Sequence, residues 1–192
     1  MTTTRQLQPE SATAVSATTR PAAAGYALGA LRLVVGWTFL WAFFDKLFAL
    51  GFSTGRDEET GAIDRFGDAA WINGGSPTEG FLSFGAAGPF EGFYHAIAGA
   101  TLTNWAFMLG LLAIGVSLML GVFERLGTIA GVVMYLMMWT VVLPPENNPF
   151  VDDHVLGALA VLVLGLLGAS CHLGLGRTWK SLPIVRRYPV LR

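Results

Sequence analysis

The sequence predicts an all-α integral membrane protein that forms a four-transmembrane-helix bundle with a long outer connector. Three observations predict this fold: the composition is apolar, four stretches are long enough to cross a bilayer, and basic residues favour one side of these stretches. Hydrophobic residues make up 53% of the 192-residue chain and charged residues 13%. Average soluble domains carry about 25% charged residues. The chain therefore has the composition of a protein that is solvated by membrane lipid.

A transmembrane helix needs about 20 predominantly apolar residues. The chain has four such stretches, at residues 26–50, 105–123, 126–143 and 155–175. Only Glu124 and Arg125 separate the second stretch from the third, so these two are expected to form a tight helical hairpin. Two polar connectors remain, at residues 51–104 and 144–154.

The chain divides into three predicted regions. Residues 1–24 are rich in Thr, Ser, Ala and Pro without an apolar period, and are expected to form a disordered cytoplasmic tail. Residues 25–176 form the predicted transmembrane domain, and residues 177–192 a basic cytoplasmic tail.

The placement of lysine and arginine predicts the orientation in the cell membrane. The C-terminal tail has five basic residues and no acid, whereas acids outnumber Arg56 and Arg65 in the 51–104 connector. Loops rich in lysine and arginine stay on the cytoplasmic side. A multi-pass arrangement with both termini cytoplasmic satisfies this rule, and it places both polar connectors on the outer face.

The 51–104 connector has more pattern than a linker. Aromatic residues alternate with glycines in its second half, and residues 91–99 fit a short amphipathic helix. Structureless loops of this length are uncommon in compact domains. We therefore expect the connector to contain one or two short interfacial helices that cap the outer mouth of the bundle.

Two pairs of charges lie in or beside the predicted spans. Arg32 is within the first span, where a charge is costly; it either extends to the lipid head groups or forms a structural ion pair with Glu124. Asp45 and Lys46 lie near the outer end of the same span. Lys46 would bind an anion if it faced the bundle, with Asp45 or Asp153 beside it, and otherwise would anchor the helix at the interface.

Residues 143–155 hold most of the polar chemistry near the membrane, in a frame rich in proline. Asp152 or Asp153 would cap the fourth helix. His154 follows in its first turn, where a histidine with a neighbouring carboxylate exchanges a proton near neutral pH. A capping Asp with a structurally bonded His is the alternative.

Small and aromatic residues recur at helical spacing. Trp37 and Trp41 in the first span, and Tyr135 and Trp139 in the third, form stripes that would line a slot for a quinone head group. Interfacial aromatic belts and packing within the bundle explain these stripes equally well. Glycine pairs such as 25/29 and 127/131 favour close packing within the bundle over a dimer interface.

Several classes of site are disfavoured. The single cysteine, Cys171, excludes an intrachain disulfide and a CxxC redox pair. No nucleotide-binding motif or metal-ligand spacing occurs, no basic patch suits nucleic acid, and no flavin site is evident. His154 and His172 would lie about 27 Å apart in one continuous helix, too far to share a haem iron.

These residues together resemble the DoxX/DoxD family of four-helix membrane proteins. The resemblance covers residues 28–175 and rests on Arg32, Gly36 and Lys46, on the Gly-Val-Phe-Glu-Arg-Leu-Gly run at 121–127, and on Asn148-Pro149-Phe150 followed by Asp153-His154. The long connector after the first span is closer to the DoxD branch.

The resemblance implies a subunit of thiosulfate:quinone oxidoreductase. In that activity thiosulfate is oxidised to tetrathionate while a membrane quinone is reduced, and a small partner subunit or a larger respiratory complex accompanies the protein. We expect His154, Asp153 and Asp45 to act in catalysis. The anion would be bound by Lys46, Arg56 and Asn148, and the quinone by the four aromatic residues Trp37, Trp41, Tyr135 and Trp139.

Two other functions remain open. One is a non-catalytic membrane anchor or accessory subunit of a respiratory or thiol-stress redox complex, and the other is a small-solute transporter. Convergence of Lys46, Asp153 and His154 into one outer pocket would favour the enzyme. Without that convergence, the accessory-subunit function would be favoured.

Overall fold

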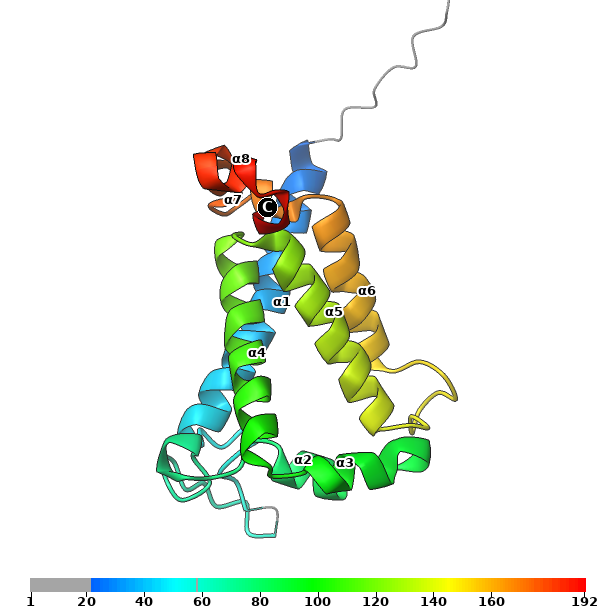
Figure 1. Ribbon diagram of the computed structural model, residues 1–192. Helices are drawn as coiled ribbons and strands as arrows, with labels where there is room; N and C mark the ends of the chain where they lie inside the picture. The colour runs from blue at the N-terminus through cyan, green and yellow to red at the C-terminus, as the bar shows by residue number, and fades with distance from the viewer. Residues whose placement is uncertain (1–21, 58) are drawn as a thin grey trace, which may run out of the picture.

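A computed structural model describes residues 22–57 and 59–192, and these residues form helices joined by turns and loops. Figure 1 shows the long helices running between two ends of the molecule, with short helices across each end. The long helices are α1 (Ala22–Phe48), α4 (Thr101–Leu120), α5 (Glu124–Val141) and α6 (Asp153–Leu166). The short ones are η1 (Trp71–Asn73), α2 (Glu79–Phe84), η2 (Gly88–Phe90), α3 (Glu91–Ile97), η3 (Ala169–Cys171), α7 (Gly176–Ser181), α8 (Pro183–Arg187) and η4 (Pro189–Leu191).

The first three predicted spans correspond to α1, α4 and α5, each displaced by a few residues. Helix α1 begins at Ala22, so the last three residues of the predicted 1–24 tail are helical; residues 1–21 lie outside the described part. Among the described residues, α1 and α4 are the two helices long and apolar enough to be candidate membrane spans. The all-helical prediction is therefore confirmed for the described residues, and a four-span arrangement goes beyond this finding.

The predicted fourth span, 155–175, is not one continuous helix. Helix α6 ends at Leu166, and Gly168 takes the left-handed backbone conformation at φ +66°. That conformation ends a helix and favours glycine. The chain then turns through η3 toward α7, so the assumption that His154 and His172 share one helix is wrong.

The bundle packs mainly as two helix pairs, α1 with α4 and α5 with α6. A Cβ atom on Gly36 would lie 3.0 Å from the Cβ atom of Leu118, which shows how closely α1 approaches α4. The core beneath these contacts contains Phe39, Phe43, Met108, Leu111, Ile114, Leu118 and Val161.

The glycine pairs serve packing within the chain, as expected. Gly25 and Gly29 of α1 pack against His172, Gly127 packs against Ser117, and Gly131 packs against Val161. Each of these contacts joins two elements of the same bundle.

The 51–104 connector does contain short helices, as predicted. Helices α2 and α3 lie across one end of the bundle, between the ends of α4 and α5 (Figure 1). Two hydroxyl contacts hold them: Tyr94 Oη lies 2.5 Å from Thr140 Oγ1, and Thr78 Oγ1 donates to Asn104 Oδ1 at 2.6 Å. A second apolar cluster of Leu82, Ala86, Tyr94 and Val141 packs beneath these helices.

Candidate functional site

The N-terminus of α6 carries a histidine–carboxylate pair. Asp152 is the N-cap: its Oδ1 accepts hydrogen bonds from the backbone N–H groups of His154 at 3.0 Å and Val155 at 3.2 Å. Its Oδ2 lies 2.6 Å from Nδ1 of His154. Asp153 is exposed. The carboxylate beside His154 is therefore Asp152, and not the Asp153 that we predicted as its catalytic partner.

The surroundings of Asp152 set its pKa. Partial burial raises the pKa, but the hydrogen bonds from the His154 side chain and from the backbone of Val155 and His154, with the charge of His154, lower it further. The net result is a pKa below the ordinary aspartate value. Asp152 is thus a carboxylate held in its charged form beside an imidazole.

Three of the other predicted site residues stabilise the turn that follows α1. Asp45 is 1% exposed, and its carboxylate accepts from the backbone of Phe52 and Ser53 at 3.1 and 2.8 Å. Lys46 Nζ donates to Ser53 Oγ at 3.0 Å. Arg56 Nε donates to the backbone oxygen of Gly51 at 2.9 Å, so each of these charges has a structural contact in the same turn.

Asn148 forms a turn in the second connector. Its Oδ1 accepts from the backbone of Phe150 at 2.9 Å and Val151 at 3.1 Å. Such a local bond from an Asn side chain to the backbone two residues later is a common turn motif. The side-chain oxygen of Asn148 is therefore engaged in the connector itself.

The predicted anion pocket is not assembled around these residues. Figure 1 shows the C-terminal end of α1 and the connector before α6 on opposite sides of the molecule. The described hydrogen bonds of Lys46 and His154 join each to its own segment. Lys46 and His154 therefore do not converge on one outer pocket (Figure 1).

The four predicted quinone-binding aromatics fall into three separate places. The rings of Trp37 and Trp41 lie 5.8 Å apart, tilted by 38°, on the outer face of α1, where they and Thr38 bound a shallow hollow of about 330 Å³. Tyr135 lies inside, with its ring 5.0 Å from that of Phe39 and 6.4 Å from that of His154. Trp139 donates from Nε1 to the backbone oxygen of Phe150 at 3.2 Å.

A larger apolar cavity, which the sequence did not reveal, lies between α4 and α5. The two helices diverge from their hairpin toward α2 and α3 (Figure 1), and the cavity between them has a volume of about 430 Å³. Its polar lining residues are Thr78, Thr103 and Tyr94. The apolar lining includes Phe81, Leu82, Leu102, Phe107, Gly110, Ile114, Val133, Met134, Met137, Met138 and Val141.

None of the four predicted aromatic residues lines this cavity. Met134, Met137 and Met138, spaced three and four residues apart on the third span, line the cavity. The predicted residues Tyr135 and Trp139 are their neighbours in sequence. The rotation of α5 about its own axis decides which stripe faces the cavity, and the sequence does not determine that rotation.

Arg32 is a structural charge, but it does not pair with Glu124. It is 1% exposed and donates to four backbone oxygens. Nη1 donates to Leu118 and to Met119 at 3.1 Å, and Nη2 donates to His172 at 3.2 Å and to Leu173 at 2.8 Å. Arg32 therefore joins α1 to the C-terminal end of α4 and to the irregular segment after α6.

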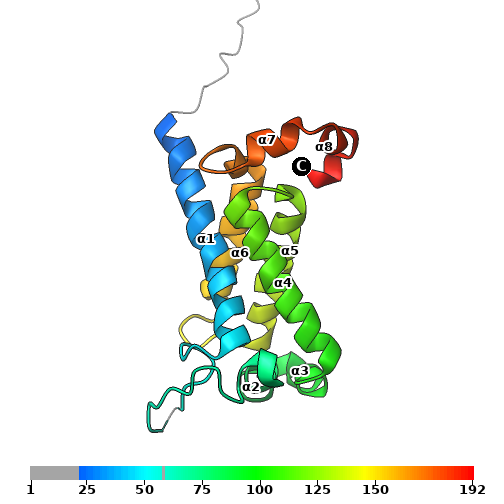
Figure 2. The ribbon, with the colours of Figure 1, turned by 90° about the vertical axis from the view of Figure 1, so that its left-hand side faces the viewer.

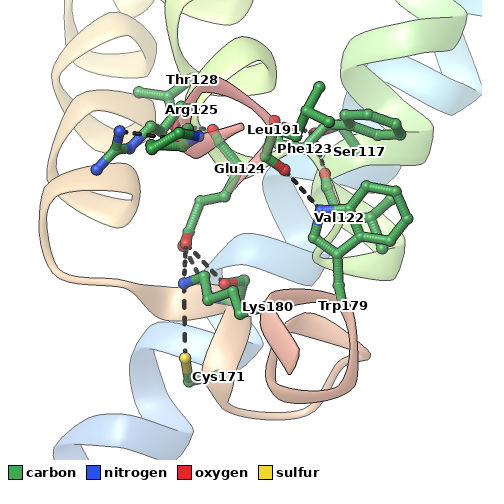
Figure 3. Close-up of polar contacts among 12 residues, drawn as sticks. Ser117, Val122, Phe123, Glu124, Arg125, Thr128, Cys171, Trp179, Lys180 and Leu191 are labelled. Carbon is green, nitrogen blue, oxygen red and sulfur yellow. Dashed lines mark hydrogen bonds and ion pairs between the residues drawn. The ribbon is translucent and has the colours of Figure 1, made fainter. Parts of the chain in front are cut away.

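Glu124 forms its ion pair with the C-terminal segment, as Figure 3 shows. Its Oε2 accepts from Lys180 Nζ at 2.6 Å, and its two carboxylate oxygens accept from the backbone and hydroxyl of Ser170. Lys180 Nζ also lies 3.6 Å from Cys171 Sγ. A carboxylate in the first turn of a helix is stabilised further by the helix dipole.

Neither protein-family models, curated proteins nor solved structures provide a match to this chain. Among residues 22–57 and 59–192, no three His, Cys, Asp or Glu side chains lie together as a metal ion would require. The candidate sites are thus the His154–Asp152 pair and the cavity between α4 and α5.

Proposed function

We propose that this chain is a four-span membrane protein of the DoxX/DoxD type that binds a membrane quinone in the cavity between α4 and α5, as a subunit of a redox complex. The single observation that carries the proposal is the apolar cavity of about 430 Å³. Ligand sites for small molecules are mostly apolar and measure about 300–1,000 Å³.

The outer surface of the bundle supports its place in a membrane. Large apolar side chains are exposed on all four long helices. Exposed apolar patches above a few hundred Å² are rare on soluble monomers. The exposed residues include Leu31, Val34 and Trp37 of α1, Leu102 and Leu109 of α4, Ile129, Val133 and Met137 of α5, and Leu156, Leu159 and Leu166 of α6.

The short fourth helix is compatible with a fourth span. The 14 residues of α6 extend about 21 Å, less than the roughly 30 Å of a bilayer core. Backbone that leaves the helix at membrane depth must find partners inside the protein. The guanidinium of Arg32 supplies such partners for the oxygens of His172 and Leu173.

A quinone suits the chemistry of the cavity. Its isoprenoid tail is apolar, and its ring carbonyls accept hydrogen bonds. Leu102, Val133 and Met137 line the cavity and are also exposed at the outer surface, so a ligand dissolved in the bilayer can enter between α4 and α5. Three residues of the cavity lining, Thr78, Thr103 and Tyr94, carry a hydroxyl group.

The family resemblance supplies the proposed donor. Two thiosulfate ions would each form one half of a new S–S bond in tetrathionate, and their two electrons with two protons would convert the quinone to quinol. His154, with its ring held by the Asp152 carboxylate, is the proposed proton donor. The pair is not part of the cavity lining, so protons would reach the quinone through intervening groups.

The test is quinone binding and thiosulfate-dependent quinone reduction by the purified chain in nanodiscs. Gly110→Leu fills the cavity, because a Cβ at this position points at the flexible end of Met134. Ala113→Leu adds similar bulk at an exposed position of the same helix outside the cavity. We expect Gly110→Leu to lose bound quinone and Ala113→Leu to keep it. Equal binding by both variants would place the quinone elsewhere.

A non-catalytic accessory subunit is the second candidate, and the separation of Lys46 from His154 favours it. In that case the cavity still binds quinone or lipid, but the chain alone does not oxidise thiosulfate. Wild-type chain that binds quinone without turnover, and whose His154→Ala variant behaves identically, would identify this role. Turnover that is lost in His154→Ala with folding retained would identify the enzyme.

A further inference from the structure

The C-terminal segment is a folded platform across the end of the bundle. Helices α7 and α8 lie across the direction of the long helices, beyond the α4–α5 hairpin (Figures 1 and 2). Trp179 Nε1 donates to the backbone oxygen of Leu191 at 2.6 Å, and the backbone N–H of Arg125 donates to that of Arg192 at 2.8 Å. We call residues 176–192 the C-terminal platform; it replaces the tail that the sequence predicted.

Several contacts fix the platform to the bundle. Lys180 forms the ion pair with buried Glu124, and Arg125 Nη1 donates to the backbone oxygen of Pro189 at 3.0 Å. Val185 is fully buried, and Trp179 packs its ring 4.5 Å from that of Phe123. The platform therefore presents a defined surface.

That surface is basic. Arg177, Arg186 and Arg187 are exposed, and residues 171–192 include no aspartate or glutamate. Lys180 is engaged by Glu124, so its charge is neutralised locally. The three arginines are free of carboxylate partners within the described residues, and a negative ligand is the species that complements them.

The platform also exposes apolar side chains. Ile184, Tyr188 and Val190 are about half exposed, at 57%, 49% and 55%. The guanidinium carbon of Arg187 lies 5.6 Å from the centre of the Tyr188 ring, so charge and apolar surface are adjacent. Segments that combine basic and apolar side chains bind at the boundary between head groups and acyl chains.

We propose that the C-terminal platform binds anionic phospholipid head groups of the leaflet that faces it. The arginines would contact the phosphates, and the apolar side chains would enter the upper acyl region. A free phosphate ion would use the arginines alone and leave Ile184 and Val190 in water, whereas a lipid would contact both kinds of side chain. Each basic residue near such a surface strengthens binding about fivefold.

The test is native mass spectrometry of the purified full-length chain in detergent, with phosphatidylglycerol or phosphatidylcholine added at equal concentration. We expect at least about tenfold stronger retention of phosphatidylglycerol, from the combined effect of three arginines. The preference should weaken as salt is raised, because salt screens exposed charges. Equal retention of the two lipids by the wild-type chain would overturn the proposal, whatever the variants do.

The variants place the site. Arg177→Gln, Arg186→Gln and Arg187→Gln combined should remove the preference, whereas Arg65→Gln, which changes an exposed arginine of the 51–104 connector, should keep it. Arg186→Gln is the single change matched to Arg65→Gln and should weaken phosphatidylglycerol binding about fivefold. A preference retained by the triple variant, or abolished by inorganic phosphate at the lipid's concentration, would contradict a lipid site on the platform.

Discussion

At the scale of single residues, Arg32 explains how a charge is accommodated in an apolar helix. The last carbonyl groups of α4 have no partners within their own helix. The carbonyl groups of His172 and Leu173, in the irregular segment after α6, also lie outside a helix. The guanidinium donates to oxygens in both places. A planar group with five donors is suited to this task, and a lysine ammonium is not.

Arg32→Met is expected to destabilise the fold by about 3 kcal/mol or more, because several buried carbonyls lose their donor at about 1–3 kcal/mol each. Arg32→Lys should recover only part of the loss. Unfolding in detergent with increasing dodecyl sulfate measures both changes. Arg177→Met, at an exposed position, serves as the control and should have little effect. A stable Arg32→Met variant would show that the carbonyl contacts contribute little.

Asp152 gives the stability a pH dependence whose sign follows from its lowered pKa. A carboxylate with a depressed pKa in the folded state stabilises the fold above its ordinary pKa. The stabilisation is lost as pH falls through the folded pKa, here below about pH 4. Unfolding measured from pH 7 to pH 3 should show this loss.

Asp152→Asn should flatten that pH dependence and cost about 1 kcal/mol or less at pH 7, since Asn is also a good N-cap but loses the charged contact with His154. Asp153→Asn removes an adjacent exposed carboxylate and should keep the wild-type profile. If both variants retained the loss below pH 4, another group would be responsible.

At the scale of elements, the contact between Tyr94 and Thr140 links α3 to α5 at the edge of the cavity. The hydroxyls lie 2.5 Å apart, and Tyr94 also donates to the backbone oxygen of Met137 at 3.3 Å. Since α3 lies across the open end between α4 and α5 (Figure 1), this bond helps to hold α3 over the cavity.

Tyr94→Phe and Thr140→Val should each lower stability by about 1 kcal/mol, the usual net value of a hydrogen bond. Their effects should not add, because both remove the same bond. A double-mutant cycle on the free energy of unfolding measures this coupling. Phe93→Leu, at an exposed neighbour of Tyr94, is the control. Additive effects would mean that the two hydroxyls act independently.

At the scale of the whole molecule, the sequence predicted the positions of the long helices better than the contacts between them. Runs of apolar residues identified α1, α4 and α5 within a few residues, because lipid-like composition is a strong signal. The end of α6 was missed because Gly165 and Gly168 are equivalent in sequence, whereas only Gly168 has a positive φ. The predicted pocket of Lys46, Asp153 and His154 does not form, because the rotation of each helix about its axis and its place in the bundle decide which side chains come into contact. Lys46 and His154 share an end of the bundle but not a side of it.

The four-span and two-span arrangements place the connector at residues 144–154 on different sides of the membrane. If only α1 and α4, the two candidate spans, cross the membrane, then α5 and α6 stay on the side of the termini, and so does the connector at residues 144–154. If all four cross, that connector lies outside, with the 51–104 connector. Asn147 is exposed in the first of these connectors, and Glu59 in the second.

We therefore expect Asn147→Cys and Glu59→Cys, each in a Cys171→Ser background, to react with an impermeant maleimide on intact cells. Ser181→Cys should react only after the membrane is opened, since segments rich in lysine and arginine are expected on the cytoplasmic side. Glu59→Cys and Ser181→Cys behave alike in both arrangements and control for labelling and permeability. Protection of Asn147→Cys in intact cells would reduce the protein to two spans and leave α5 and α6 as a hairpin on the cytoplasmic side. The cavity between α4 and α5 would then not open to the bilayer, and quinone entry by that route would be lost with it.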